Sequence, residues 1–564
     1  MQRLWNIIPQ QYRHRTIWVA VTIFLRALLN FMGVATLIPV LVLILDRDAV
    51  STNSHLARIY EAINPDSYAK FVTTICALIV GIILIKNIAT LLLYRAERNY
   101  IYGLYKHLSE SLYISYHNRG YGYIKSSNSA VLTRNVNVVS LMFVAGVLKP
   151  LATIISEAML FVLIMGAIAW YNPSVALLTT TIFLPIVVLF YLAMRHRLHD
   201  IGEFENRAQR LKSRIVAESF RGYADIEIGG AYPQMFSRFE SALNDIVKLR
   251  KRNATIGMLP QMFTEVGLAI GLATLVVLSL CYSGKDMALV FGIFAVAAIR
   301  LVPSIKGIMS SWSAIRYNRY TIDTMQDATE QNTTSPVYEV DRLNFNNTIE
   351  LKNVSFKFED AVDSTINNLS LTIKRGERIG IQGTSGVGKT TLFNLILGLY
   401  RPTSGTIYID GVELTENNIR KWQNSVGYVS QSVFIAEGTI AENIAFGYSA
   451  DMIDYKRINE VIELADLKEL VDNLDKGVDT RIGEQGSRLS GGQRQRIGIA
   501  RALYKGCDIL LFDEATSSLD NTTEQNINRA IERLSAENKA LTIAIIAHRD
   551  SSLEYCDRII TLGE

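Results

Sequence analysis

A glycine-rich segment that ends in lysine and two threonines is the first part of the sequence with a clear chemical use. Residues 383–391 read Gly-Thr-Ser-Gly-Val-Gly-Lys-Thr-Thr, between an apolar strand-like stretch at 378–382 and an apolar helix-like stretch at 392–399. Glycines let backbone N–H groups approach a phosphate, so this spacing is typical of a phosphate-binding loop. We therefore expect a site for a nucleotide and Mg²⁺, built from Gly383, Thr384, Ser385, Gly386, Val387, Gly388, Lys389, Thr390 and Thr391. This loop alone does not distinguish a kinase, a GTPase and an ATPase.

Individual side chains in this loop have distinct expected roles. The Lys389 ammonium can neutralise the β and γ oxygens of a nucleotide, and the Thr390 hydroxyl can ligate Mg²⁺. Asp513 ends a second apolar strand-like stretch at 509–512, where a carboxylate can reach the same Mg²⁺. Glu514 beside it is placed to polarise an attacking water. The pattern indicates nucleotide hydrolysis.

A third motif lies just before those carboxylates. Residues 489–493 read Leu-Ser-Gly-Gly-Gln and open a basic, helix-like stretch. The exposed backbone N–H groups at such a helix start can bind an anion. Ser490, Gly491, Gly492 and Gln493 are therefore candidate nucleotide-binding residues.

Together the three motifs resemble the Walker A, signature and Walker B elements of the ATP-binding cassette (ABC) ATPases. The resemblance implies that Glu514 is the general base, that His548 contacts the γ-phosphate, and that Gln431 ligates Mg²⁺ and orients water. It places Asp520 in the D-loop and Phe358 where an aromatic ring stacks on adenine, although the family often has tyrosine there. In this family the signature of one subunit closes on nucleotide held by another, which implies a homodimer.

The composition indicates a membrane protein with more than one domain. Of 564 residues, 49% are hydrophobic and only 20% are charged. A net charge of +4 is small for this length and argues against nucleic-acid binding. The four cysteines have no metal-site spacing, so we expect buried thiols rather than a zinc site or disulfides.

Six hydrophobic runs occupy the first 325 residues. They cover 16–45, 71–94, 138–170, 174–194, 256–282 and 287–312, each at or beyond the ~20 residues that span a bilayer. The long, basic connections at 95–137 and 195–255 place both termini and both loops in the cytoplasm. These loops resemble those of ABC exporters, and we expect short coupling helices at 129–136 and 234–242.

Charged residues inside the expected spans are mostly cationic. Arg26, Lys86, Lys149, Arg300 and Lys306 outnumber Glu157 and Glu265. Arg26, Lys86 and Arg300 fall near the middle of the membrane, where charges are costly and therefore commonly functional. One interpretation is a water-filled cavity that favours an anionic cargo. The other is that lysines reach the interface and the glutamates pair with the remaining cations.

The first external connection is expected to contain a short helix at 54–63. Leu56, Ile59, Tyr60 and Ile63 share one face of that helix. This apolar face either packs on the tops of the spans or docks a lipid tail.

The whole chain resembles an ABC exporter half-transporter. We expect a six-helix, all-α transmembrane domain of the type IV exporter fold at 1–325, a linker at 326–340, and an α/β P-loop ATPase domain at 341–564. The cation excess and the external helix resemble the flippases that carry lipid-linked oligosaccharides for bacterial protein N-glycosylation. That resemblance implies an anionic polyprenyl-pyrophosphate glycan as cargo and the bacterial inner membrane as location. A general lipid or multidrug exporter is the alternative, and an ATP-gated channel or membrane regulator is a third reading that no sequence feature favours.

Overall fold

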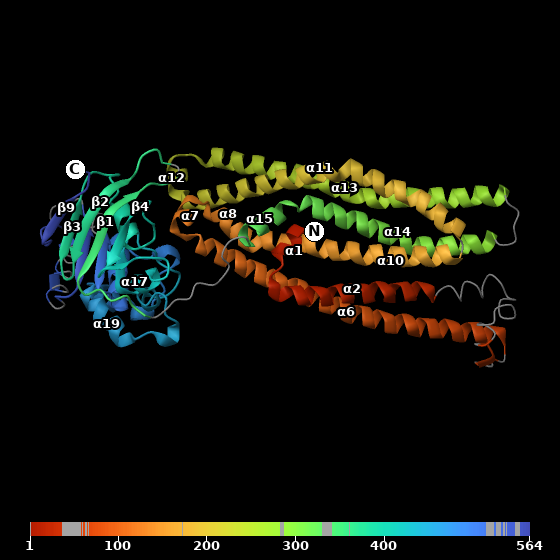
Figure 1. Cartoon of the computed structure of the whole chain (residues 1–564), viewed down its shortest axis with the longest axis horizontal. Coiled ribbons are helices and arrows are strands. Elements are labelled where there is room, and N and C mark those ends of the chain that lie inside the picture. Colours follow the sequence, from red (N-terminus) through yellow and green to blue (C-terminus); the bar gives the residue numbers. More distant parts are fainter. Residues whose placement is uncertain are drawn as a thin grey trace. The chain divides into compact units, whose positions relative to one another are not determined.

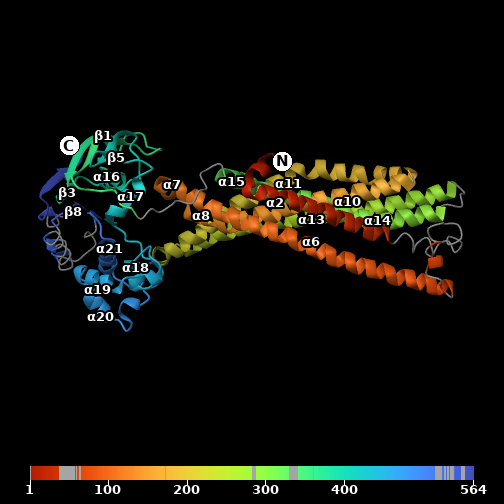
Figure 2. The ribbon, with the colours of Figure 1, turned by 60° about the horizontal axis from the view of Figure 1, so that its bottom comes forward.

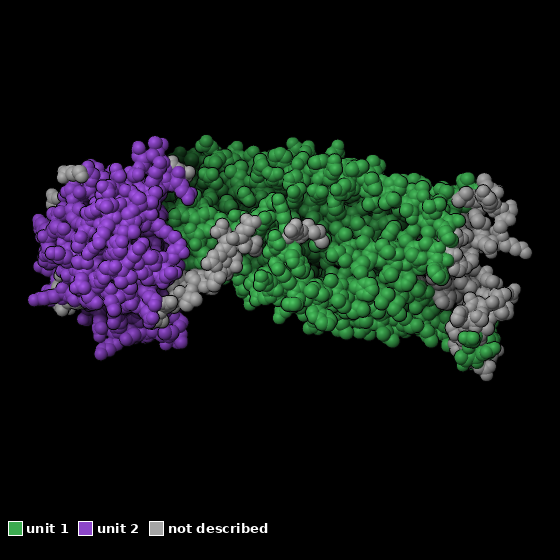
Figure 3. Space-filling model, viewed as in Figure 1, with its two compact units in different colours: residues 1–335 green, residues 336–564 purple. Residues whose placement is uncertain are grey.

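The computed structural model divides into two compact units, residues 1–335 and 336–564 (Figure 3). The structure describes residues 2–36, 58, 60–62, 65, 67–171, 173–281, 287–329, 341–359, 361–514, 524, 525, 529, 532, 533, 536, 539–547 and 553–563. Each unit has its own hydrophobic clusters.

The first unit is entirely helical in its described residues. Its helices are α1 (Gln2–Ile7), α2 (Gln10–Ala35), α6 (Tyr68–Asn118), α7 (Gly120–Ser126), α8 (Ser129–Arg134), α9 (Ser140–Phe143), α10 (Lys149–Tyr171), α11 (Pro173–Arg221), α12 (Tyr223–Ile228), α13 (Tyr232–Cys281), α14 (Met287–Tyr317) and α15 (Tyr320–Thr329). Two π-helical turns, η1 (Asn135–Val139) and η2 (Val144–Leu148), join α8, α9 and α10 into one continuous helical path.

The long helices pack as neighbouring pairs, α2 with α6, α10 with α14, and α11 with α13 (Figure 1). Five helical segments are long and apolar enough to cross a membrane: Gln10–Gly33, Tyr68–Asn118, Ser129–Trp170, Pro173–Arg221 and Tyr232–Val277. They contain the second, third and fourth expected spans and overlap the first and fifth, 16–45 and 256–282, of which α2 is described as helical to Ala35 and α13 to Cys281. The sixth lies in α14, whose 31 residues also reach across a bilayer at ~1.5 Å per residue.

The expected short helices at 129–136 and 234–242 are wrong. Both stretches are the first turns of long helical segments, Ser129–Trp170 and Tyr232–Val277. The short helices are α7 and α12, which precede these stretches in the two loops. The helix is interrupted at Arg119–Gly120, between α6 and α7, and at Gly229–Gly230, between α12 and α13. Gly120 and Gly230 have positive φ at these interruptions.

The second unit contains two sheets (Figure 2). An antiparallel sheet has the order β2-β1-β4-β5, formed by β1 (Thr348–Phe356), β2 (Ile366–Lys374), β4 (Ser404–Ile409) and β5 (Val412–Glu413). A parallel sheet has the order β6-β7-β8-β3-β9, formed by β3 (Arg378–Gln382), β6 (Val426–Val429), β7 (Ile509–Asp513), β8 (Thr542–Ile546) and β9 (Arg558–Thr561).

The strands β7 and β8 are buried along their whole length, which explains their continuous apolar sequences. The helices of this unit are α16 (Lys389–Ile396), α17 (Ile419–Ser425), α18 (Ile440–Ile444), α19 (Tyr455–Leu464), α20 (Lys468–Asp472) and α21 (Gly491–Lys505), with short 3₁₀ turns at Ala450–Met452, Gly477–Asp479 and Glu484–Gly486. Since β3, β6 and β7 run parallel, the residues after them reach the same edge of the sheet.

Candidate functional site

The glycine-rich loop connects β3 to the first turn of α16. Gly383, Gly386 and Gly388 have φ values of 152°, 85° and 104°, a region that favours glycine. A Cβ on Gly388 would also lie 3.0 Å from the Thr365 carbonyl oxygen. Lys389, at the start of α16, is 5% exposed, and its Nζ donates to the carbonyl oxygens of Gly383 (2.8 Å) and Thr384 (3.2 Å). The loop backbone therefore surrounds the Lys389 ammonium group. Its glycine conformations are typical of loops that bind phosphates through backbone N–H groups.

Asp513 meets the end of this loop at the carboxyl edge of the sheet. Thr390 Oγ1 donates to Asp513 Oδ1 at 3.0 Å, and the Tyr428 hydroxyl donates to Oδ2 at 3.1 Å. Asp513 is only 3% exposed, and this burial raises the pKa of its carboxyl, although the two hydrogen bonds oppose that rise. Tyr428 lies on β6 beside β7, a neighbour that the motif spacing does not reveal.

Glu514 follows Asp513 in a left-handed conformation, with φ of 50°. Its backbone N–H donates to Ile546 O at 3.0 Å, which fixes the turn out of β7 against β8. Gln431 Nε2 donates to Glu514 Oε2 at 2.8 Å. The structure therefore brings Gln431, Glu514 and Asp513 together, as the sequence motifs require.

These side chains fit Mg²⁺ and a nucleoside triphosphate. The Thr390 hydroxyl, the Asp513 carboxylate and the Gln431 side-chain oxygen are hard oxygen donors of the kind Mg²⁺ prefers. Lys389 and the loop's backbone N–H groups would hold the phosphates. Bound Mg²⁺ would neutralise charge on the β and γ phosphate oxygens.

Phe358 follows β1 and is 38% exposed. Its ring packs edge-on against Phe356 at 4.9 Å and against Tyr400 at 5.5 Å between centroids. These contacts fix the ring and leave part of its surface free for a purine.

The signature residues form the amino-terminal end of α21. The Ser490 hydroxyl accepts the backbone N–H of Gln493 at 3.2 Å, and the Gln493 side chain accepts the backbone N–H of Ser490 at 2.8 Å. These two hydrogen bonds form a reciprocal capping box. Gly491 and Gly492 lie between its two residues, in the first turn of α21. A Cβ on Gly491 would meet no atom within 4 Å, so the surface over this turn is open.

Two expected site residues, His548 and Asp520, lie outside the described residues. The expected place of His548 is directly after β8, which lies between β7 and β3 in the sheet.

Arg501 on α21 is a residue that the motif analysis missed. Its guanidinium donates to Asn443 O at 2.8 Å and to Phe434 O at 2.9 Å, and lies 4.8 Å from the Phe446 ring centroid. Burial lowers its pKa to about 10. It joins the signature helix to the segment that follows Gln431. In the sequence, Arg501 is only one more arginine in a predicted basic helix. Its partners, Asn443 and Phe434, are 58 and 67 residues away in the chain, so the sequence does not reveal them.

The membrane cations differ from one another. Arg26 Nη1 donates to Glu97 Oε2 at 2.7 Å, and both side chains are largely buried. Glu97 lies beyond the hydrophobic run that was expected to end at 94, so the sequence count of acidic residues omitted it. Lys86 on α6 and Arg300 on α14 are half-buried and close enough to repel each other. Within the described part of the chain, neither has a carboxylate partner.

The acidic residues expected in the spans have other partners. Glu157 Oε2 accepts a hydrogen bond from Ser304 at 2.7 Å, and Glu265 Oε1 accepts one from Gln261 at 2.9 Å. Lys306 donates to the same Gln261 side chain at 2.9 Å. Lys149 is exposed.

The expected external helix is described only in part. Leu56, Ile59 and Ile63 lie outside the described residues. Tyr60 is helical and packs edge-on against Phe71 of α6, with 4.8 Å between ring centroids. That contact favours packing onto a span for this one residue.

Comparison with known proteins gives a consistent assignment. The model of the ABC transporter family matches residues 366–517. The ATP-dependent lipid A-core flippase of Ralstonia nicotianae is 31% identical over 395 residues, which cover 68% of this chain and 65% of that protein, just under two thirds of its length. The protein of the same description from Burkholderia pseudomallei is 30% identical over 414 residues, 73% of this chain and 68% of the relative.

The fold is similar to a solved structure described as a bacterial Atm1-family ABC exporter with ATP bound. The TM-score is 0.78 at 22% identity, over 98% of this chain and 94% of that one. The expected type IV exporter fold is therefore confirmed, with a helical membrane region followed by an α/β ATPase domain.

Proposed function

Because the chain belongs to the ABC exporter family and carries that family's ATP-hydrolysing domain, we propose that it flips an anionic, lipid-linked oligosaccharide across the bacterial inner membrane. In this cargo, an anionic pyrophosphate links a polyprenyl lipid tail to the glycan. Relatives described as lipid A-core flippases support lipid transport in general. The anionic cargo rests on the membrane cations of this chain.

The observation that carries this proposal is the pair Lys86 and Arg300. Both project from membrane-crossing helices, and no carboxylate in the described part of the chain offsets them. Charges inside a bilayer are costly unless they are paired or hydrated. A pyrophosphate offers the compensating charge to two neighbouring cations. Arg26 is less suited to this role because Glu97 already neutralises it.

The test is flipping of a fluorescent polyprenyl-pyrophosphate glycan in liposomes by a Lys86→Ala/Arg300→Ala variant. We expect a loss of at least about tenfold in flipping, since two charge-assisted contacts would be lost, with basal ATP hydrolysis retained. Lys106→Ala is the matched control, because Lys106 is 79% exposed on the same helix as Lys86 and pairs with Glu110. Unchanged flipping in the double variant would remove the proposed headgroup site.

A general lipid exporter is the second candidate, favoured by the description of the relatives. Stimulation of ATP hydrolysis by a panel of lipids separates the two. Our proposal expects stimulation by lipid-linked pyrophosphate glycans over lipid A and over apolar cations. Equal stimulation by all three would support the general exporter.

The ATPase cycle follows from the site. Glu514, held by Gln431, would accept a proton from the attacking water, while Lys389 and the loop amides hold the phosphates. The surface over the first turn of α21 is open, and the sequence has one phosphate loop, at 383–391, and one signature, at 489–493. We therefore propose a homodimer with two shared sites, in which ATP closes the ATPase units and hydrolysis reopens them. The ATPase units and both termini lie in the cytoplasm.

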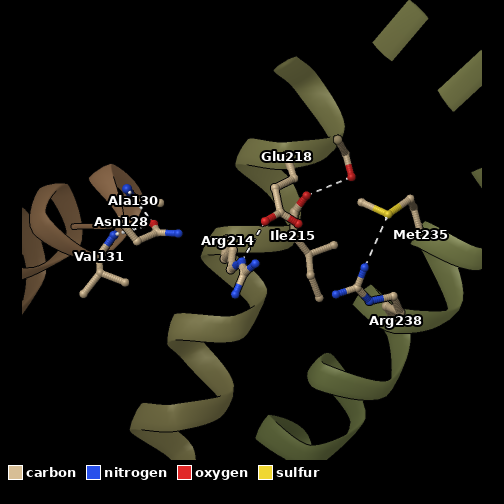
Figure 4. A network of polar contacts seen from close by, with 9 residues as sticks. Asn128, Ala130, Val131, Arg214, Ile215, Glu218, Met235 and Arg238 are labelled. Carbon is tan, nitrogen blue, oxygen red and sulfur yellow. Dashed lines mark hydrogen bonds and ion pairs between the residues drawn. The ribbon is translucent and has the colours of Figure 1, made fainter. Parts of the chain in front are cut away.

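The helices α7 and α12 are the proposed coupling helices. Around α12 the aromatic and aliphatic side chains are strongly exposed, with Phe220 at 78% and Ile228 at 89%. Figure 4 shows polar contacts within single elements here, Arg214 with Glu218 (2.6 Å) on α11 and Arg238 with Met235 (3.9 Å) on α13. One contact joins two elements, since Arg221 at the end of α11 donates to the Ser129 hydroxyl of α8 at 3.0 Å. Asn128 likewise caps α8, by accepting the backbone N–H groups of Ala130 and Val131 (Figure 4). The apolar tip is thus left available to an ATPase unit.

A further inference from the structure

The last membrane helix and the helix that follows it are separated by a two-residue break. Helix α14 ends at Tyr317 and α15 begins at Tyr320 (Figure 1). Asn318 closes α14 through its side chain, which donates to Ala314 O at 2.8 Å. The Asn318 carbonyl then accepts from the Thr321 hydroxyl at 2.7 Å and from the Thr321 backbone N–H at 3.0 Å. Both residues are buried, so the break is a defined joint.

Two glycines on other helices make room for this joint. An added Cβ on Gly202 of α11 would overlap the carbonyl oxygen of Tyr317. An added Cβ on Gly146 of η2 would overlap the side chain of Asn318. The backbones of α11 and α14 therefore lie in close contact at Tyr317, and the backbone of η2 lies directly against the Asn318 side chain.

A buried carboxylate ties the joint to a second pair of helices. Glu205 of α11 is 6% exposed and accepts a hydrogen bond from the Tyr317 hydroxyl on one oxygen. Its other oxygen accepts from Arg250 Nε of α13 at 2.8 Å. One side chain thus connects α11, α13 and the end of α14. Such shared polar contacts resist independent movement of their members, since each buried group lost from the network is left unsatisfied.

The other end of α15 is anchored as well. Met325 is 1% exposed and packs in the cluster formed around Leu108 and Leu112 of α6. Asp327 forms an ion pair with Arg119 at 3.0 Å, at the break between α6 and the proposed coupling helix α7. Helix α15 is the last described element before the second unit. It therefore connects that chain segment to both cytoplasmic loops.

We propose that the joint at Tyr317–Asn318, with Glu205 and Gly202, is a positioning element for the transport step. Displacement of the chain ahead of the ATPase unit is passed through α15 to α11 and α13, and so to the coupling helix α12. Glu205 and Tyr317 act through the helices they hold and touch neither nucleotide nor cargo. The inference rests on the proposed ATP-driven cycle, and is independent of which lipid is carried.

The experiment uses the full-length protein in liposomes, with a spin label on Ala224→Cys, an exposed position of α12, and the four native cysteines replaced by serine or alanine. The distance between the labels of the two subunits in the proposed homodimer is measured before and after addition of Mg²⁺, ATP and vanadate. Basal ATP hydrolysis and the thermal midpoint of unfolding are measured on the same samples. Tyr317→Phe and Gly202→Ala are compared with Tyr102→Phe and Gly166→Ala. Tyr102 is more than half exposed on α6, and a Cβ on Gly166 would meet no atom within 4 Å.

We expect the two joint variants to lose more than about half of the nucleotide-dependent change in label separation, while basal hydrolysis stays within roughly twofold and both controls behave as wild type. A full response in both joint variants would overturn the proposal. So would a parallel fall of hydrolysis, label response and thermal midpoint, which indicates a purely structural role. If Gly202→Ala does not fold, Glu205→Gln replaces it, because the single amide oxygen of glutamine cannot accept from Tyr317 and Arg250 through two separate oxygens, as Glu205 does.

The readout also separates this inference from the proposed cargo. A wild-type protein that moves no lipid-linked glycan but shows the nucleotide-dependent label response would refute the cargo alone. A normal response in the joint variants, with glycan flipping intact, would refute the joint alone.

Discussion

Glu514 lies beside the strand-end carboxylate Asp513 and accepts a hydrogen bond from Gln431. Replacement by glutamine keeps the size of the side chain and removes its basicity. We expect Glu514→Gln to bind ATP normally and to lose at least about 100-fold in turnover, the usual contribution of a general base. Nucleotide binding and phosphate release measured on the same sample test this, and wild-type turnover would exclude Glu514 as the base.

Arg501 depends on the shape of its guanidinium, because it donates to two carbonyl groups in different directions. Lysine keeps the charge and cannot make both contacts. We expect Arg501→Lys to cost about 1–3 kcal/mol of unfolding free energy, since the carbonyl of the buried residue Asn443 loses its donor. Denaturant unfolding of the purified protein measures this. Arg207→Lys, at a mostly exposed position on α11, is the control and should change little.

The elements around the nucleotide site follow from the sequence to a large extent. The apolar stretches at 378–382 and 509–512 predicted strands before the phosphate loop and before Asp513, and β3 and β7 confirm both strands. The hydrogen-bond partners of Arg26 and Arg501 could not be predicted from the sequence. Glu97 and Asn443 are remote in sequence from the residues they contact, and no periodic pattern encodes such a pairing.

The short cytoplasmic helices show a different limit. Helical periodicity continues through residues 129–136 and 234–242, so the pattern alone could not tell the start of a long helix from an isolated turn. The backbone breaks at Gly120 and Gly230 decide where the short helices end or begin. Positive φ at those glycines depends on the path of the chain before and after them.

Helix α12 offers a prediction at this scale. Ile228 is 89% exposed, so an aspartate there removes almost no contact within the chain. If its apolar surface docks onto an ATPase unit, Ile228→Asp should reduce transport about tenfold through the buried charge, with an unchanged thermal midpoint. Val362→Asp is the matched control, since Val362 is 88% exposed in the ATPase unit. Normal transport by Ile228→Asp would argue against docking at this position.

A homodimer with shared sites makes a prediction for the whole molecule. Lys389→Ala disables the phosphate loop, and Ser490→Arg blocks the signature. Each variant alone should have almost no ATPase activity. In a mixed dimer, the intact loop of one chain faces the intact signature of the other, so one site is restored. Co-expressed chains with two different affinity tags test this, and inactive mixed dimers would contradict the shared-site arrangement.

The capping box at the start of α21 also bears on how readily such a dimer reopens. Ser490 and Gln493 already satisfy each other's backbone N–H groups. A phosphate that arrives at this helix end competes with the capping box for these two N–H groups, so at them closure exchanges hydrogen bonds instead of adding them. The net gain in binding free energy from each of these contacts is then small. In the proposed homodimer, loss of one phosphate group would then suffice to separate the two subunits' shared sites and allow another cycle to begin.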